Sequence, residues 1–272
     1  MQLIDDVVEI LKIQEMVNNG VTKPFRCQSL QGDEAIVKLE RNPFGATVLI
    51  NELIGHYIAD LIGTTIPPYG ICHIGEDAIG IDEFFEDDFS ESDFIGYGFY
   101  SAFIANTIPL VELVLHTIAN CDVNKIILLD CILNNGDRHN GNLLIRMTNE
   151  PNLYTIDFSH IISKDIPWNE DRKKQLFEGD DLSMSFLKDN EEVYSILFRH
   201  RSFSADHLRK EADDIKQIIL ESDLEKILDV IPSTWNHGNC EHLAAEIIKY
   251  IKKRANKLEV LCENILEGRN AV

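Results

Sequence analysis

The chain has 272 residues, and its 46 acidic and 25 basic side chains give a formal net charge of −21. This length is enough for one large domain or for two lobes that share a cleft. An acidic surface repels nucleic-acid phosphates and anionic lipids, so we expect neither a nucleic-acid partner nor a membrane partner. The six cysteines lack paired spacing, and no apolar run approaches the roughly 18 residues of a spanning helix. Both features indicate a cytoplasmic protein with reduced thiols.

The first part of the chain predicts short strands joined by turns. Apolar and β-branched patterning marks strands at Val7–Ile13, Phe25–Leu30 and Ala35–Glu40. The loop between the first two contains Gly20 and Thr22, and its free backbone N–H groups could lie over phosphates. A plain hairpin loop is the alternative interpretation of this segment.

A lysine and a glutamate then follow in the order of a phosphate-binding ion pair. Lys38 lies within the apolar third strand, where an ammonium group is costly unless it has an anionic partner. The next periodic segment, Val48–Ile62, predicts a helix that carries Glu52 in its first half. A strand lysine paired with a helix glutamate is the arrangement found in kinases. Taken alone, Lys38 could also point to the solvent face of a half-buried strand.

Two further short strands, Tyr69–Ile74 and Ala78–Ile81, complete a small α+β lobe that we place over residues 1–83. The acidic segment that follows is expected to connect this lobe to a second one over residues 84–272. Backbone groups near Ile81 and Glu83 are candidates for binding an adenine edge. A solvated acidic linker would explain the same composition.

The second lobe is predicted to be mainly helical. Apolar periodicity indicates helices at Phe99–Thr107, Leu110–Ala119, Asn124–Asn134, Glu191–Phe198, Ser204–Leu220, Asp223–Val230 and Cys240–Leu266. Asn124–Asn134 is apolar on most sides, so we expect it to be buried.

The chemistry is concentrated between these helices, in two segments that we interpret as a catalytic loop (134–145) and a metal-binding segment (153–160). Asp137 and Asn142 are five residues apart, as are the catalytic base and the metal-binding amide of kinases. A strand, a turn and a second strand would bring Asp157 back beside Asn142. A carboxylate and an amide oxygen suit magnesium. Singly, Asp137–Arg138 could be a local salt bridge and Asp157 could end a strand.

These residues carry a resemblance to a known family. The stretches NNGDRHNGNLLI and YTIDFSH resemble the catalytic core of the HipA-like kinases, and INELIGHYIADLIGTTIPP and IPSTW resemble further segments of that family. The resemblance implies a two-lobed protein-kinase-like fold of the α+β class. Residue by residue it implies that Lys38 binds phosphates, Glu52 pairs with Lys38 and Asp137 is the catalytic base, with Asn142 and Asp157 as magnesium ligands.

The chain departs from the family pattern at several places. Ser159 stands where many kinases have the glycine of Asp-Phe-Gly, and the loop Asn19–Lys23 has one glycine in place of a glycine-rich triplet. Because strand-like sequence starts almost at once, we expect no counterpart of the additional N-terminal subdomain of HipA toxins, which leaves an antitoxin-type partner open.

The expected function is an ATP- and magnesium-dependent kinase that phosphorylates serine or threonine of a protein substrate. A small-molecule kinase, or a lipid kinase of the phosphatidylinositol type with a similar Asp-Arg-His pattern, is the first alternative. A non-catalytic nucleotide-binding pseudokinase is the second.

Overall fold

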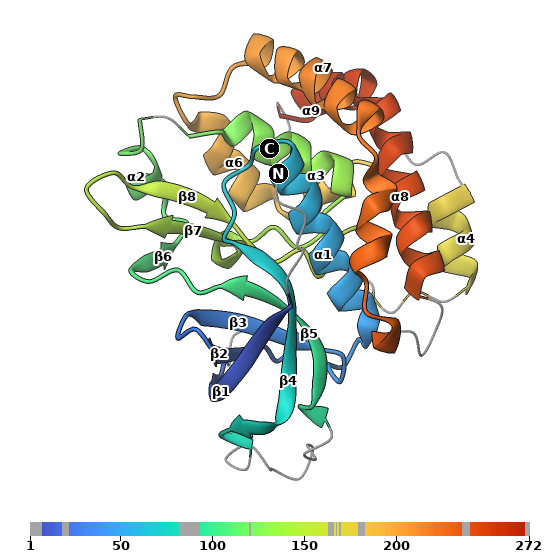
Figure 1. Cartoon of the computed structure of the whole chain (residues 1–272). Helices are drawn as coiled ribbons and strands as arrows, with labels where there is room; N and C mark the ends of the chain where they lie inside the picture. Colours follow the sequence, from blue (N-terminus) through green and yellow to red (C-terminus); the bar gives the residue numbers. More distant parts are fainter. Residues whose placement is uncertain are drawn as a thin grey trace.

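Five strands form a closed barrel at one end of the molecule in the computed structural model, which describes residues 7–17, 22–81, 93–119, 121–162, 166, 168, 170–178, 183–235 and 240–269 (Figure 1). The strands are β1 (Val8–Met16), β2 (Phe25–Ser29), β3 (Glu34–Leu39), β4 (Tyr69–Ile79) and β5 (Gly96–Ala102). Their order is β1-β2-β3-β5-β4, and a parallel pairing between β1 and β4 closes the barrel, while the other pairings are antiparallel.

Strands β4 and β5 correct two expectations from the sequence. The predicted helix Phe99–Thr107 is wrong, because residues 96–102 form a strand between β3 and β4. Gly98 permits this close packing, since a Cβ there would lie 2.7 Å from the carbonyl oxygen of Lys38. The two predicted strands after residue 68 are one continuous strand, β4. The barrel therefore includes a strand that lies beyond the predicted lobe boundary after residue 83.

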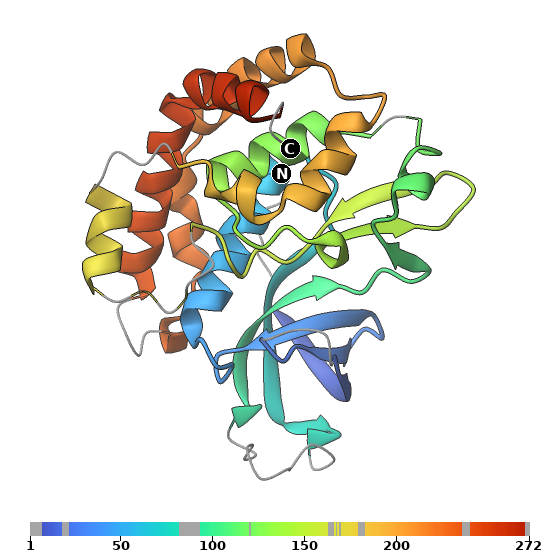
Figure 2. The same cartoon turned by 180° about the vertical axis from the view of Figure 1, so that it is seen from behind.

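Helix α1 (Ala46–Leu61) lies between the barrel and the helical part of the molecule, as the opposite views of Figures 1 and 2 both show. It confirms the helix predicted at Val48–Ile62. Every residue from 48 to 59 is buried, including the polar residues Asn51, Glu52 and His56. This central position holds Glu52 in the interior rather than on a solvent-facing helix surface.

The remaining helices form the larger part of the molecule. They are α2 (Glu112–Leu115), α3 (Val123–Leu133), α4 (Glu170–Glu178), α5 (Ser185–Asp189), α6 (Glu191–Arg199), α7 (Ala205–Glu221), α8 (Cys240–Asn256) and α9 (Leu258–Gly268), with 3₁₀ turns at Asn140–Asn142, Leu224–Val230 and Ser233–Trp235. The buried helix α3 and the helices α6 and α7 confirm their predictions. The predicted helix Leu110–Ala119 was too long, because only the single turn of α2 is helical there. The predicted helix Cys240–Leu266 divides into α8 and α9, which are separated by Lys257.

A small antiparallel sheet joins this helical part to the candidate site. It consists of β6 (Thr107–Pro109), β7 (Leu143–Arg146) and β8 (Asn152–Thr155) in the order β6-β7-β8. Leu143 pairs with Thr155, so the residues just before β7 and just after β8 lie at the same end of the sheet. This is the hairpin that the sequence predicts.

Buried apolar side chains form two separate cores. The barrel core fills the interior of the barrel and includes Cys27 and Cys72. The large core contains α1, α3, α7 and α8, together with Ile71 and Phe99 from the barrel strands. None of the six cysteines forms a disulfide within the described part of the chain, and all six are buried.

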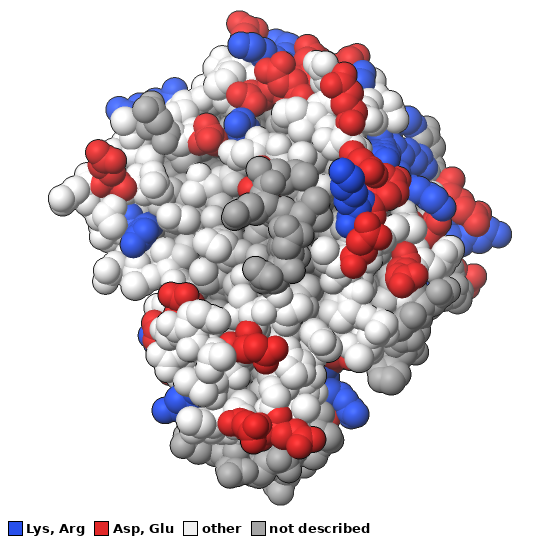
Figure 3. Space-filling view, viewed as in Figure 1, with Lys and Arg blue, Asp and Glu red and all other residues white. Residues whose placement is uncertain are grey.

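Charged side chains are unevenly distributed on the face shown in Figure 3, where most gather over α7, α8 and α9. Among the described residues, no helix combines the length and the apolarity that crossing a bilayer requires.

Candidate active site

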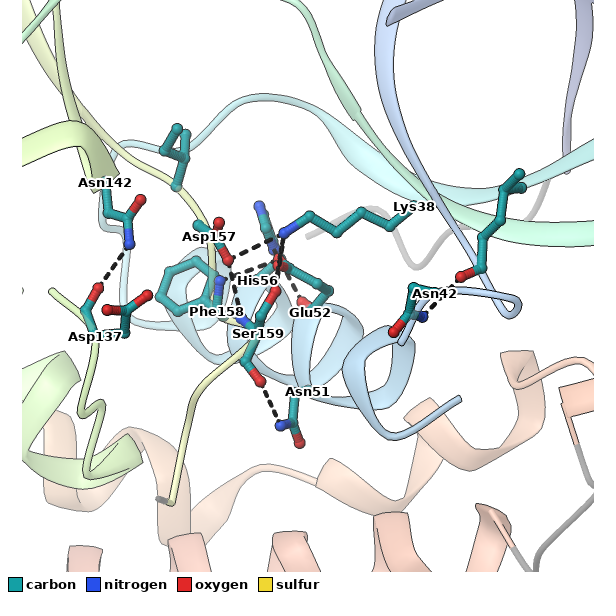
Figure 4. Close-up of polar contacts among 12 residues, drawn as sticks. Lys38, Asn42, Asn51, Glu52, His56, Asp137, Asn142, Asp157, Phe158 and Ser159 are labelled. Atoms are coloured by element: carbon teal, nitrogen blue, oxygen red, sulfur yellow. Dashed lines mark hydrogen bonds and ion pairs between the residues drawn. The ribbon is translucent and has the colours of Figure 1, made fainter. Parts of the chain in front are cut away.

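Lys38, Glu52 and Asp157 meet where the barrel, α1 and the end of β8 come together (Figure 4). Lys38 Nζ lies 2.5 Å from Glu52 Oε1 and 3.0 Å from Asp157 Oδ1. The lysine comes from the barrel, the glutamate from α1, and the aspartate from the segment after β8. The structure thus brings together three of the predicted site residues from three different elements.

The turn between β3 and α1 sets the relative position of Lys38 and Glu52. The amide nitrogen of Asn42 donates to the carbonyl oxygens of Leu39 and Gly45, and its Oδ1 accepts from the backbone N–H of Phe44. Gly45 precedes the helix with φ of 64°, a left-handed conformation that glycine adopts without steric cost. One asparagine and one glycine therefore direct the chain from the strand into α1.

The ammonium group of Lys38 is fully engaged within the chain. It is 6% exposed, and it donates to Glu52, to Asp157 and, over 2.9 Å, to the Oγ of Ser159. These are all three donors that an ammonium group possesses. Burial opposes the charge of Lys38, but the carboxylates of Asp157 and Glu52 outweigh it and raise the pKa of Lys38 above its ordinary value.

Glu52 ties α1 to the segment that carries Asp157. Its Oε1 accepts from Lys38 and from the hydroxyl of Ser159, and its Oε2 accepts from the backbone N–H of Phe158 at 3.1 Å. Burial disfavours the charge of Glu52, but Lys38 and then His56 counter it, so the pKa of Glu52 lies well below its ordinary value. Glu52 is therefore ionised at neutral pH although it is 1% exposed.

The predicted catalytic loop begins where α3 ends. Asn134 caps α3 in the left-handed conformation, with φ of 47°. Its side-chain amide donates to the carbonyl oxygen of Ile162, and the backbone N–H of Gly136 donates to the carbonyl oxygen of His160. The backbone N–H of Asp137 donates to Asn135 Oδ1, and the Asp137 side chain is half-buried. The loop is thus anchored to the segment after Asp157, while Asp137 stays accessible.

Asn142 lies beside Asp157, and these two residues could hold a metal ion together. The backbone N–H of Ile156 donates to the carbonyl oxygen of Asn142, which places Asp157 next to it. The amide nitrogen of Asn142 donates to the carbonyl oxygen of Asp137 over 2.6 Å, so Oδ1 is the atom of this side chain that could bind a metal ion. One amide oxygen and one carboxylate fit magnesium, which takes few protein oxygens and fills its shell with water and phosphate oxygens.

Arg138 is a structural residue of this loop whose partner the sequence did not reveal. It forms a fully buried ion pair with Asp130 of α3 and not a local bridge with Asp137. Its NH1 donates to the carbonyl oxygens of Asn142 and Ile156, so one guanidinium joins the catalytic loop to the metal-binding segment. The hydroxyl of Tyr194 also donates to Asp130 over 2.9 Å.

Only two of the four predicted nucleotide contacts outside this centre, Thr22 and Ile81, lie in the part of the chain that the structure describes. Gly20 and Glu83 lie outside the described residues. Thr22 is buried and lines a cavity of about 10 Å³ with Phe94 and others, none of them among the predicted catalytic residues. Ile81 is buried in the barrel core.

Two polar residues at the centre, Asn51 and Ser159, were not among the predicted site residues. Ser159 was noted as a departure from the kinase glycine. Asn51 was visible only as part of the Asn-Glu pair in the α1 sequence. Their contacts span more than a hundred residues of chain, so no local signal identifies them.

Comparison with known proteins identifies one matching family. The model of a family described as HipA-like kinase matches residues 10–261. Comparison with functionally characterised protein sequences gives no match.

Three solved structures resemble this chain at low sequence identity. The Helicobacter pylori proinflammatory kinase CtkA is 12% identical, with a TM-score of 0.55 over 96% of this chain and 99% of that chain. The Golgi casein kinase is 11% identical, with a TM-score of 0.47 over 98% of this chain and 73% of that chain. Its structure with Mn/ADP bound has a TM-score of 0.49. The likeness to CtkA shows a kinase-like fold and confirms that part of the predicted fold class.

Proposed function

This chain belongs to the HipA-like kinase family and is a phosphotransferase, and we propose that it transfers the γ-phosphoryl group of ATP to a serine or threonine hydroxyl of a protein substrate, with magnesium as its metal. The observation that carries the proposal is the meeting of Lys38, Glu52 and Asp157 next to a loop that presents Asp137 and Asn142. Phosphoryl transfer requires mainly positioning and charge neutralisation, and this set supplies both.

Each residue has a distinct role in the proposed reaction. Lys38 binds phosphate oxygens as a positive charge, and Glu52 keeps its ammonium group in place. Asn142 and Asp157 hold magnesium, which neutralises phosphate charge when it is bound. Asp137 orients the acceptor hydroxyl and takes its proton as the oxygen–phosphorus bond forms and the bond to the ADP leaving group breaks.

We further propose that the barrel and α1 bind the nucleotide. The candidate contacts are the backbone groups of Gly20, Thr22, Ile81 and Glu83. Lys38 belongs to this part, while the catalytic loop and the metal-binding segment belong to the helical part. The nucleotide would therefore lie between the two parts.

The test is transfer of label from γ-labelled ATP with magnesium, by the purified protein alone and with a cytoplasmic lysate. We expect label in protein, at serine or threonine. Asp137→Asn should lower the rate by about 10²- to 10⁴-fold, because proton transfer to a positioned base contributes that much. Asp157→Ala should abolish transfer. Asp214→Asn, which removes an exposed carboxylate on α7, is the matched control and should leave the rate unchanged.

The other outcomes separate the alternatives. Label in a lipid or a metabolite, with none in protein, would contradict the protein substrate and favour a small-molecule or lipid kinase. ATP binding without label transfer to any acceptor would contradict catalysis and favour a pseudokinase.

A further inference from the structure

Ser159 lies at the centre of the charged cluster, although its side chain carries no charge. It is 1% exposed, its Oγ accepts from Lys38 Nζ over 2.9 Å, and its hydroxyl donates to Glu52 Oε1 over 2.7 Å. Lys38 and Glu52 also bind each other directly. One hydroxyl thus bridges both members of the ion pair, which neither glycine nor alanine can do because neither has a side-chain donor or acceptor.

The backbone of Ser159 is held by the same helix. The amide nitrogen of Asn51 donates to the carbonyl oxygen of Ser159 over 2.7 Å, and Glu52 accepts from the N–H of Phe158. Two consecutive residues of α1 therefore hold two consecutive residues of the metal-binding segment. The N–H of Ser159 in turn donates to Asp157 Oδ1 over 3.2 Å, so Ser159 contacts every charged group of the cluster.

The side chain of Asn51 lowers the stability of the fold at its position. It is fully buried in α1, and its Oδ1 finds no hydrogen-bond partner in the described part of the chain. A buried, unsatisfied oxygen costs stability, and an apolar residue would avoid that cost. The contact of its amide nitrogen with Ser159 is the compensating interaction that the structure shows.

We propose that Ser159 is a positioning residue, which fixes the orientation of the Lys38 ammonium and the Glu52 carboxylate, and that Asn51 anchors it to α1. This inference rests on the proposed function, because the orientation matters for holding phosphates. Ser159 acts only through Lys38 and Glu52 and is not itself a reacting group. The serine at the glycine position of the kinase motif thereby joins α1, β3 and the metal-binding segment.

The test compares Ser159→Ala with the wild-type protein and with Ser29→Ala. Ser29 is a buried barrel serine whose Oγ accepts from the N–H of Asp33, away from the site, so it controls for the loss of any buried hydroxyl. We expect Ser159→Ala to lower kcat by about 10- to 100-fold, the usual effect of removing a residue that orients a functional group. KM for ATP should change by less than kcat, and Ser29→Ala should leave both unchanged.

A second measurement does not depend on activity. Acylation of Lys38 by an amine-selective reagent at alkaline pH, quantified by peptide mass spectrometry, reports how firmly its ammonium group is held. Ser159→Ala should acylate faster at Lys38 than the wild-type protein, and Ser29→Ala should not. Asn51→Leu fills the buried position with an apolar side chain of similar size and removes the anchor, and it should shift kcat and acylation in the same direction. If Ser159→Ala does not fold, the same two measurements on Asn51→Leu test the inference.

Unchanged acylation of Lys38 in both site variants, or a kcat within twofold of wild type, would overturn the inference. An inactive wild-type protein would instead contradict the proposed function. The acylation rates would still decide whether Ser159 positions Lys38.

Discussion

At the scale of single residues, the site depends on charges that are buried but satisfied. Removing Lys38 and Glu52 from water is costly, and only their mutual contact and the surrounding donors and acceptors offset that cost. The pKa of Glu52 is lowered and the pKa of Lys38 is raised. Both shifts mean that the folded chain favours the charged form of each side chain.

These shifts predict how stability depends on pH. Glu52 stabilises the fold above its ordinary pKa of 4.5, and this contribution is lost as pH falls through its lowered value. Lys38 stabilises the fold below 10.5, and its contribution is lost as pH rises through its raised value. Between these limits the stabilisation from the pair should be constant.

Glu52→Gln should therefore lower the free energy of unfolding by about 3 to 5 kcal/mol at neutral pH, because it leaves a buried ammonium without its main partner. Denaturant titrations of both proteins should show that this difference shrinks as the pH is lowered below 4.5. Glu112→Gln, which breaks the exposed pair with Arg199, should have a much smaller effect. A difference that stays constant far into the acid range would show that Glu52 is not stabilised as a carboxylate.

The sequence predicted most members of this site but not the residues that hold them. Lys38 was identifiable because a lysine is unusual within an apolar strand, and Asp137, Asn142 and Asp157 were identifiable by their spacing and order. Ser159 was not, because serine is common in turns and its role arises only when α1 packs against it. For the same reason Arg138 had Asp137 as its nearest candidate partner, although Asp130 is the one it binds.

At the scale of elements, long apolar helices were predictable and short aromatic segments were not. Helices α1 and α3 are confirmed because their apolar residues continue over three or more turns. Strand β5 was mistaken for a helix because its glycines and aromatic residues show no clear period. Its conformation is set by its neighbours β3 and β4, which no local pattern reveals.

Helix α1 owes its position to a single glycine. A Cβ at Gly55 would overlap the Cβ and Cγ of Phe158, so the helix can approach the metal-binding segment only without a side chain there. Alanine is the better helix former by about 1 kcal/mol. Packing and helix propensity therefore act in opposite directions at this position.

We expect packing to dominate in Gly55→Ala. The variant should lose about 1 to 3 kcal/mol of stability, as overpacked cores do, and should show reduced phosphoryl transfer, because Phe158 adjoins Asp157. Thermal unfolding and the labelled-ATP assay measure the two effects. Gly75→Ala in β4 is the matched control, since the atom nearest to its added Cβ is 4.0 Å away. A more stable and fully active Gly55→Ala protein would mean that the metal-binding segment shifts to accommodate the added methyl group without loss of stability or activity.

At the scale of the whole molecule, the two cores differ in size and are joined at the site. The barrel core is small, while the large core includes α1 and most of the other helices. Lys38 comes from a barrel strand, and Glu52 comes from a helix of the large core. The Trp235 indole N–H adds a second connection, because it donates to the carbonyl oxygen of Tyr97 in β5 over 3.1 Å.

Hydrogen exchange should reveal this division. Amides of β1 and β2, which border only the small core, should exchange at least about tenfold faster than those of α1 and α3. Strands β4 and β5 contribute to both cores through Ile71 and Phe99, so their amides should exchange at intermediate rates. Mass spectrometry of peptides from each strand tests this order. Equal protection throughout would show that barrel and helices open as one unit.

The burial of all six cysteines has a consequence for the chemistry of this chain under oxidising or alkylating conditions. The thiolate is the reactive form of cysteine, and burial raises the pKa of Cys27 to about 12 and that of Cys131 to about 11. In the folded molecule these thiols are therefore shielded from reagents and are not ionised to the reactive thiolate. Cys27 and Cys72 lie in the barrel core, and Cys121, Cys131, Cys240 and Cys262 lie in the large core. Modification at one set or the other is thus a record of which part of the molecule has opened.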